Sequence, residues 1–106
     1  MVYLVYVTAG SEEEACKLAR EVTEKRLAAC VNIYPRIFSY YWWEGEVQED
    51  KEVSLIFKTS AQKVEKLIEA IKELHSYSCP CALAWPVEKG NPDFLAWVRA
   101  ETENKS

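Results

Sequence analysis

One short segment of this chain carries three side chains that commonly bind metal ions. His75, Cys79 and Cys81 lie within the seven-residue sequence His-Ser-Tyr-Ser-Cys-Pro-Cys. Imidazole and thiolate groups are good ligands for soft and borderline metals such as copper and zinc. Because three such groups so close in sequence could converge on one ion, the segment predicts a metal site of His75, Cys79 and Cys81.

The same segment also has a purely structural interpretation. Its spacing is not a standard zinc motif, which would contain Cys-x-x-Cys or two histidines on one helix face. Pro80 fixes the backbone between the two cysteines, so their thiols can point apart. In this interpretation Cys79 and Cys81 are small packing residues, and His75 caps the end of the preceding helix. The sequence leaves both interpretations open.

The other chemically reactive residues predict neither a nucleophile nor a phosphate site. Cys16 is expected on the polar face of a helix, and Cys30 as a small buried residue at a helix-to-strand junction. The one histidine has no adjacent aspartate, and the chain has no Gly-x-Ser-x-Gly elbow. Its three scattered glycines cannot form a phosphate-binding loop. We therefore expect a binding protein without an organic cofactor, rather than an enzyme.

Length, composition and charge bound the possible partners. The chain has 106 residues, 49% hydrophobic and 28% charged, which predicts one globular domain over residues 1–106. Its net charge of −4 repels phosphates, so we expect neither nucleic acid nor a membrane as a partner. The first residues do not resemble a signal peptide, and no apolar run reaches the length of a membrane span. These features, with four cysteines expected to be reduced, predict a cytoplasmic protein.

Hydrophobic periodicity predicts four strands and three helices. The expected strands cover residues 2–7, 30–43, 47–59 and 82–87, with a turn at 44–46. The first two expected helices cover 11–29 and 60–74. A third helix is expected to start at Pro92, capped by Asn91, and a polar, frayed tail to follow at 101–106. The continuous apolar run of the first strand is typical of a strand covered on both faces. The order β-α-β-β-α-β with a terminal helix predicts a ferredoxin-like α+β fold, whose antiparallel sheet carries both crossover helices on one face.

The second and third strands are expected to form an unusually long hairpin. Each arm has about thirteen residues, whereas typical strands have about 5–6. Pro35 predicts a bulge or an edge within the first arm. Strand alternation places Tyr41 and Trp43 on one face and Tyr40 and Trp42 on the other. Because two helices can cover only one of these aromatic faces, we expect the other to be buried in a homo-oligomer.

A series of short motifs occurs in order along the chain. They are Thr8-Ala9, Arg26-Leu27-Ala28-Ala29-Cys30-Val31-Asn32, Ser39-x-Tyr41-x-Trp43-Glu44-Gly45, Glu52 with Lys58-Thr59, His75-x-Tyr77 and Leu95-x-Trp97. Through these motifs the chain resembles the CutA-like divalent-cation tolerance proteins over essentially its whole length.

The resemblance implies a cytoplasmic, ferredoxin-like and very stable homotrimer whose long hairpins associate between subunits. It also implies a role in divalent-cation tolerance and in the response to metal ions, with copper or another divalent metal ion bound. A ligand pocket between subunits is then expected from Tyr41, Trp43, Lys58, Tyr77 and Trp97.

The chain departs from this family at the segment that carries the cysteines. The family usually has His-Pro-Tyr-Glu-x-Pro-Glu there, whereas this chain has Ser78 and Cys81 in place of the two glutamates. A thiol thus stands where a carboxylate ligand is expected. The substitution favours soft ions such as copper and zinc over hard cations.

Two other functions are compatible with the same fold. The family is similar in shape to the trimeric nitrogen-regulatory signalling proteins, which suggests a module that senses a small molecule or an anion near Lys58. A small acyl-phosphate hydrolase would need a phosphate-binding loop with an arginine after the first strand. The sequence at 8–11, Thr-Ala-Gly-Ser, offers no such loop.

Overall fold

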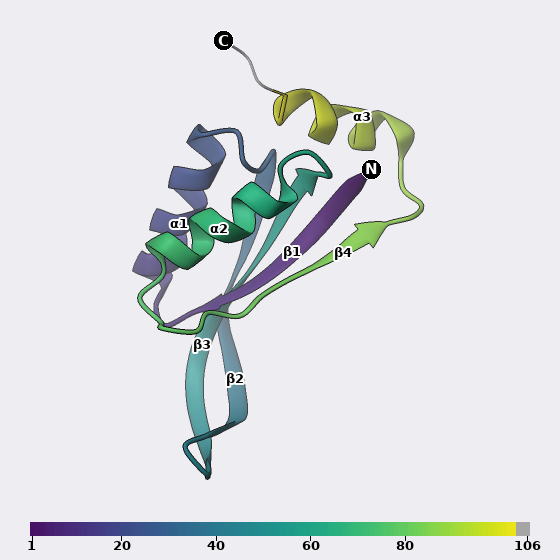
Figure 1. Ribbon diagram of the computed structural model, residues 1–106. Helices are drawn as coiled ribbons and strands as arrows, with labels where there is room; N and C mark the ends of the chain where they lie inside the picture. The colour runs from purple at the N-terminus through teal and green to yellow at the C-terminus, as the bar shows by residue number, and fades with distance from the viewer. Residues whose placement is uncertain (104–106) are drawn as a thin grey trace.

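The computed structural model describes residues 1–103 as a four-stranded antiparallel sheet with three helices (Figure 1). In chain order the elements are β1 (Val2–Ala9), α1 (Glu12–Glu24), β2 (Cys30–Trp43), β3 (Glu46–Ser60), α2 (Val64–Leu74), β4 (Ala82–Val87) and α3 (Pro92–Glu101). The strand order is β2-β3-β1-β4, and each neighbouring pair is antiparallel. Helices α1 and α2 lie on the same face of the sheet (Figure 1). The predicted ferredoxin-like α+β fold with an extra C-terminal helix is confirmed.

The hydrophobic core lies between the sheet and the two crossover helices. Alternate residues of β1 and β3 point toward these helices, because side chains of a strand alternate between its two faces. Val5, Val7, Leu55 and Phe57 are fully buried there. They pack with the apolar stripes of the helices, which are formed by Ala15, Leu18, Val22, Leu67 and Ile71.

The second face of β1 carries Leu4, Tyr6 and Thr8, which are only half-buried. Both crossover helices lie on the other face, so the expectation that this strand is covered on both faces is not met within a single chain. In residues 1–103 no helix is long and apolar enough to cross a membrane.

Helix α1 ends at Glu24, earlier than its expected end at residue 29. Arg26 has a left-handed backbone with φ of 59°. The backbone N–H groups of Arg26 and Leu27 donate to carbonyl groups of the last helical turn at 3.0 Å, a Schellman arrangement. The Arg26 guanidinium then donates to the backbone oxygen and to Oε1 of Glu101, at 3.0 and 3.1 Å. Through Arg26, the turn that ends α1 therefore connects this helix to α3.

The N-terminal caps agree with prediction at two helices. Ser11 Oγ accepts a hydrogen bond from the Glu14 N–H at 3.1 Å, and Asn91 Oδ1 accepts one from the Asp93 N–H at 3.0 Å. These side chains satisfy N–H groups that have no partner inside the helix.

The remaining helix boundaries differ from the expected ones. Helix α2 begins at Val64 and not at residue 60, because Ser60 is the last residue of β3 and pairs with Val2. The frayed tail is expected from residue 101 onward. Instead, Glu101 is the last residue of α3, and Thr102 is fully buried. Residues 104–106 of that tail lie outside the described residues.

Strands β2 and β3 form a hairpin that extends beyond the rest of the sheet (Figure 1). Its two-residue turn has φ of 51° at Glu44 and 80° at Gly45, values typical of a tight hairpin turn. The pairing register shifts between Tyr34 and Ile37, which places a bulge at Pro35 as predicted. The extra residue reverses the alternation beyond the bulge. Odd-numbered residues of β2 therefore point to the helix-free side in the outer half of the hairpin.

The even-numbered aromatic residues of the outer half form what we call the outer hairpin face. Its members Phe38, Tyr40 and Trp42 are 65%, 66% and 73% exposed. Such large apolar side chains on adjacent positions of one strand face are unusual for a chain that stays alone in water.

Candidate functional site

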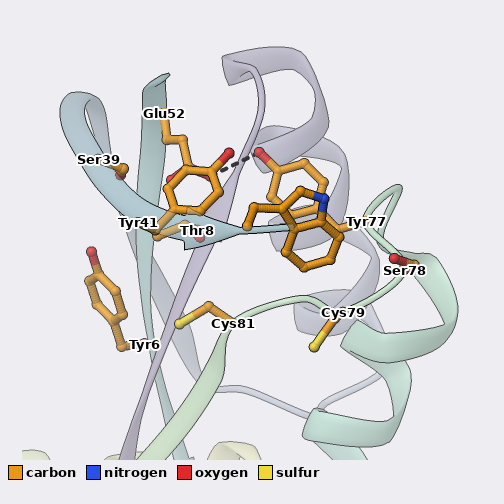
Figure 2. A pocket seen from close by; sticks show the side chains of 10 residues that line it. Tyr6, Thr8, Ser39, Tyr41, Glu52, Tyr77, Ser78, Cys79 and Cys81 are labelled. Atoms are coloured by element: carbon orange, nitrogen blue, oxygen red, sulfur yellow. Dashed lines mark hydrogen bonds between the residues drawn. The ribbon is translucent and has the colours of Figure 1, made fainter. Parts of the chain in front are cut away.

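A cavity of about 570 Å³ lies between the hairpin, the end of β1 and the connection from α2 to β4. Its lining residues come from these three regions and are Tyr6, Thr8, Ser39, Tyr41, Trp43, Glu52, Tyr77, Ser78, Cys79 and Cys81. Figure 2 shows how the labelled side chains surround it. Sequence positions more than 70 apart thus contribute to one concave site.

The strand register explains which strand residues reach the cavity. Tyr6 and Thr8 alternate onto the helix-free face of β1 and pair with Ile56 and Ser54 of β3. Two residues before Ser54, Glu52 points to the same side and pairs with Ile37. Beyond the bulge the odd-numbered residues of β2 point to this side, so Ser39, Tyr41 and Trp43 also line the cavity.

Two tyrosine hydroxyls are held by carboxylates at the cavity. The Tyr77 hydroxyl donates to Oε2 of Glu52 at 2.8 Å (Figure 2). Burial raises the pKa of Tyr77, and the hydrogen bond to Glu52 and the charge of Glu52 raise it further. The Tyr41 hydroxyl donates to Asp50, and this hydrogen bond raises the pKa of Tyr41. Both phenols therefore stay protonated and their rings are oriented.

His75 positions Tyr77 and does not itself line the cavity. Its side chain is 0% exposed. The Tyr77 backbone N–H donates to Nδ1 of His75 at 3.0 Å, so Nε2 carries the proton and donates to the Thr8 carbonyl oxygen at 2.7 Å. The two rings contact each other with centroids 4.6 Å apart. His75 is also the C-cap of α2, where the structural interpretation of the sequence placed it.

Glu14 of α1 fixes the start of the same connection. Its Oε2 accepts a hydrogen bond from the Ser76 backbone N–H at 2.8 Å, and its Oε1 accepts one from Ser76 Oγ at 3.0 Å. Burial acts to raise the pKa of this carboxyl, but the hydrogen bonds from Ser76 and further interactions with His75 and the Gly10 backbone together leave the pKa of Glu14 lowered. The connection that carries Tyr77 is thus tied to both α1 and β1.

We expect Glu14→Gln to lower the free energy of unfolding by about 1–2 kcal/mol at pH 7, because two hydrogen bonds lose a charged acceptor. A lowered folded-state pKa means that the ionised carboxyl stabilises the folded chain above its ordinary pKa of 4.5. This stability is lost as the pH falls through the lower folded-state value. Urea unfolding at pH 7 and pH 3, at one protein concentration, should show the difference between variant and parent shrinking in acid.

The matched control is Glu13→Gln, because Glu13 lies in the same helical turn but is exposed. We expect this variant to change stability by only a few tenths of a kcal/mol. Equal losses for both variants at both pH values would show that the contact with Ser76 contributes nothing.

Cys79 and Cys81 both line the cavity, on the wall formed by the α2–β4 connection (Figure 2). All four cysteines of the chain are free thiols. Burial raises the pKa of the Cys81 thiol, and the negative charge of Glu52 raises it further. In the absence of a metal ion Cys81 is therefore a protonated thiol at neutral pH.

The predicted three-residue metal site is not assembled in residues 1–103. Cys79 and Cys81 reach one cavity, but both ring nitrogens of His75 are used elsewhere. In this part of the chain no three His, Cys, Asp or Glu side chains converge in a way that could hold a metal ion. The sequence could not show this, because the ring nitrogens of His75 are engaged by the backbone of Tyr77 and by the backbone of Thr8 in β1.

The structure places three of the five residues predicted for a ligand pocket at this cavity and two elsewhere. Tyr41, Trp43 and Tyr77 line the cavity. Lys58 is absent from its lining and donates instead to the side chain of Asn32. Trp97 lies on α3 against Phe94, with ring centroids 5.6 Å apart.

Sequence reasoning did not assign Tyr6, Thr8 and Glu52 to the site. All three follow from strand alternation once the pairing of β1 with β3 is known. The assignment also requires the reversal of side-chain alternation at the bulge, because this reversal decides which residues of β2 face Glu52.

These features define a ferredoxin-like α+β protein with an extended hairpin and an aromatic cavity beside it. The chain belongs to the CutA1 divalent ion tolerance protein family, whose family model matches residues 3–101. The divalent-cation tolerance protein CutA of Archaeoglobus fulgidus is 43% identical over 99 residues, or 93% of this chain and 96% of that protein. The corresponding protein of Thermus thermophilus is 45% identical over 102 residues, or 96% and 99% of the two chains.

A longer relative and two solved structures complete the comparison. Protein CutA of Mus musculus is 45% identical over 105 residues, which span 99% of this chain but 59% of the mouse protein. A structure described as the periplasmic divalent cation tolerance protein CutA from Archaeoglobus fulgidus matches with a TM-score of 0.94 at 42% identity, covering 97% of this chain and all of that one. The Thermus thermophilus structure matches equally well, with a TM-score of 0.94 at 45% identity and the same coverage. The names of the Archaeoglobus fulgidus and Thermus thermophilus relatives describe tolerance proteins and not enzymes.

Proposed function

We propose that the chain is a metal-responsive binding protein that binds copper or zinc at the thiol wall of the cavity. The observation that carries the proposal is the placement of Cys79 and Cys81 on one cavity beside Glu52. Two thiols favour thiophilic ions over magnesium or calcium. The divalent-ion tolerance named for the family supports the same class of ligand.

In this proposal the two cysteines are the ligands and His75 is a positioning residue. His75 would have to give up a hydrogen bond to Thr8 or Tyr77 before it could reach an ion. Copper(I) accepts sites with few thiolate ligands, which suits a pair of cysteines. Nothing at the cavity favours the alternative of an anion sensor at Lys58, since that residue is absent from the lining.

We further propose that the protein is a cytoplasmic homotrimer that binds rather than catalyses. The exposed outer hairpin face supports assembly, and four free cysteines are typical of a reducing compartment. The related structure from Archaeoglobus fulgidus is described as periplasmic, so fractionation of the source cells is the direct test of location. The net charge of −4 supports our expectation that neither nucleic acid nor a membrane is a partner.

Anaerobic titration of the reduced protein with copper(I) and zinc tests the proposed function. We expect saturable copper(I) binding that is abolished in the double variant Cys79→Ser/Cys81→Ser. Thiols must lose protons to bind metal, and the pKa of Cys81 is raised above its ordinary value of 9.0. Copper(I) affinity should therefore keep rising with pH through the thiol range.

The control variant Cys16→Ser/Cys30→Ser removes the two cysteines that do not line the cavity and should bind copper(I) like the parent. Cys81→Glu should shift the preference toward ions that favour oxygen ligands. Copper(I) binding by Cys79→Ser/Cys81→Ser that is as tight as in the parent would overturn the proposal.

A further inference from the structure

The cavity is lined by an unusual number of aromatic rings. Tyr6, Tyr41, Trp43 and Tyr77 come from three separate segments of the chain and line the same space. The volume of about 570 Å³ is in the usual range for small-molecule sites, about 300–1,000 Å³. Such sites are mostly apolar and contain a small number of polar groups that select the ligand.

The charged group on the cavity wall is a carboxylate. Glu52 is the only ionisable residue among the lining residues apart from tyrosines and cysteines, and Lys, Arg and His are all absent from that lining in the described chain. Glu52 accepts the hydrogen bond from Tyr77, and Asp50, its neighbour on the same strand face, accepts the one from Tyr41. An anion entering the cavity would meet the Glu52 carboxylate with no positive side chain on the wall.

The titration of Tyr41 agrees with this sign of charge. The pKa of Tyr41 is raised first by its hydrogen bond to Asp50. The negative charges of Asp50 and Glu52 raise it further, so a negative charge on this ring is disfavoured.

Aromatic rings favour one kind of cation in particular. The face of each ring carries partial negative charge, and it attracts cations that can approach without a tightly held water shell. A small hard metal ion would need several oxygen ligands, whereas the wall offers one carboxylate. An alkylated ammonium ion needs no further ligands and buries its methyl groups against the rings.

We propose that this cavity binds a small organic cation of the quaternary ammonium class, held by the rings of Tyr6, Tyr41, Trp43 and Tyr77 with Glu52 as the opposite charge. This inference goes beyond the proposed metal response and does not need the two thiols. The two hydrogen bonds from tyrosine to carboxylate fix the ring orientation before the ligand arrives, which lowers the entropy cost of binding.

Calorimetric titration with choline chloride, compared with its uncharged carbon isostere dimethylbutanol, tests the assignment. Both probes have the same shape, so a difference reports the positive charge. We expect saturable choline binding and affinity at least about tenfold weaker for dimethylbutanol. Glu52→Gln and Tyr41→Leu should each weaken choline binding by about tenfold, and Tyr41→Phe, which keeps the ring, should weaken it less.

Two controls separate this proposal from the others. Trp97→Leu removes an exposed aromatic residue away from the cavity and should leave choline binding unchanged. The choline titrations use the reduced, metal-free parent, so the metal proposal and this one can fail independently. Equal affinity for choline and dimethylbutanol, no saturable choline binding, or normal binding by Tyr41→Leu would each overturn the inference.

Discussion

Replacing Trp42 by alanine is expected to convert the proposed trimer into smaller species at micromolar concentration. Trp42 is 73% exposed in the single chain, between Phe38 and Tyr40 on one side and the hairpin turn on the other. A tryptophan at the centre of an interface commonly contributes roughly 2 kcal/mol or more of binding free energy. A symmetric trimer would lose this contribution three times. Sedimentation velocity of parent and variant measures the change directly.

Trp43→Ala is the matched control for this prediction. Trp43 is the next residue of β2 but points to the opposite face and lines the cavity. We therefore expect it to weaken assembly less than Trp42→Ala. A parent protein that sediments as a 12.2 kDa monomer would overturn the trimer, and equal, negligible effects of both variants would place the interface elsewhere.

Phe57→Ala is expected to cost about 3–5 kcal/mol of folding free energy. Phe57 is the largest of the fully buried side chains and lies between Val5 and Val31, its partners on the neighbouring strands. Removing its ring leaves a cavity that the surrounding strands cannot close. Urea unfolding at a fixed protein concentration measures the loss.

The same chemical change at an exposed position is the control. Phe94 on α3 is 42% exposed, so we expect Phe94→Ala to cost less than about 1 kcal/mol. If both variants lost the same stability, the core described between β1, β3 and the crossover helices would not be the main source of that stability.

The order of helices and strands could be predicted because each element carries its own local pattern. The apolar periodicity, the caps at Ser11 and Asn91 and the bulge at Pro35 all depend on residues close together in sequence. The end of α1 could not be predicted, because the amphipathic pattern continues past Arg26, whose backbone is in the left-handed conformation. The hydrogen bonds of Arg26 to Glu101, on a distant helix, accompany that turn.

The site was less predictable than the fold because its parts meet only through the sheet. Five aromatic and sulfur residues singled out in the sequence share the cavity, namely Tyr41, Trp43, Tyr77, Cys79 and Cys81. The carboxylate of Glu52 could be placed beside them only from the β1–β3 register. The sequence also could not show that both ring nitrogens of His75 form hydrogen bonds with backbone groups, those of Thr8 and Tyr77. Lys58 and Trp97 came from a family resemblance that concerns a cleft between subunits, and a single chain does not bring them to this cavity.

The bulge at Pro35 restricts how the hairpin can change in length during evolution. Deleting one residue there would restore regular pairing and exchange the two faces of the outer half. Tyr41 would leave the cavity, and Trp42 would leave the outer hairpin face, in a single mutational event. Length changes that preserve both surfaces must instead add or remove two residues on each strand. The cavity wall and the outer hairpin face are therefore inherited together, and neither can be lost by such a slip without the other.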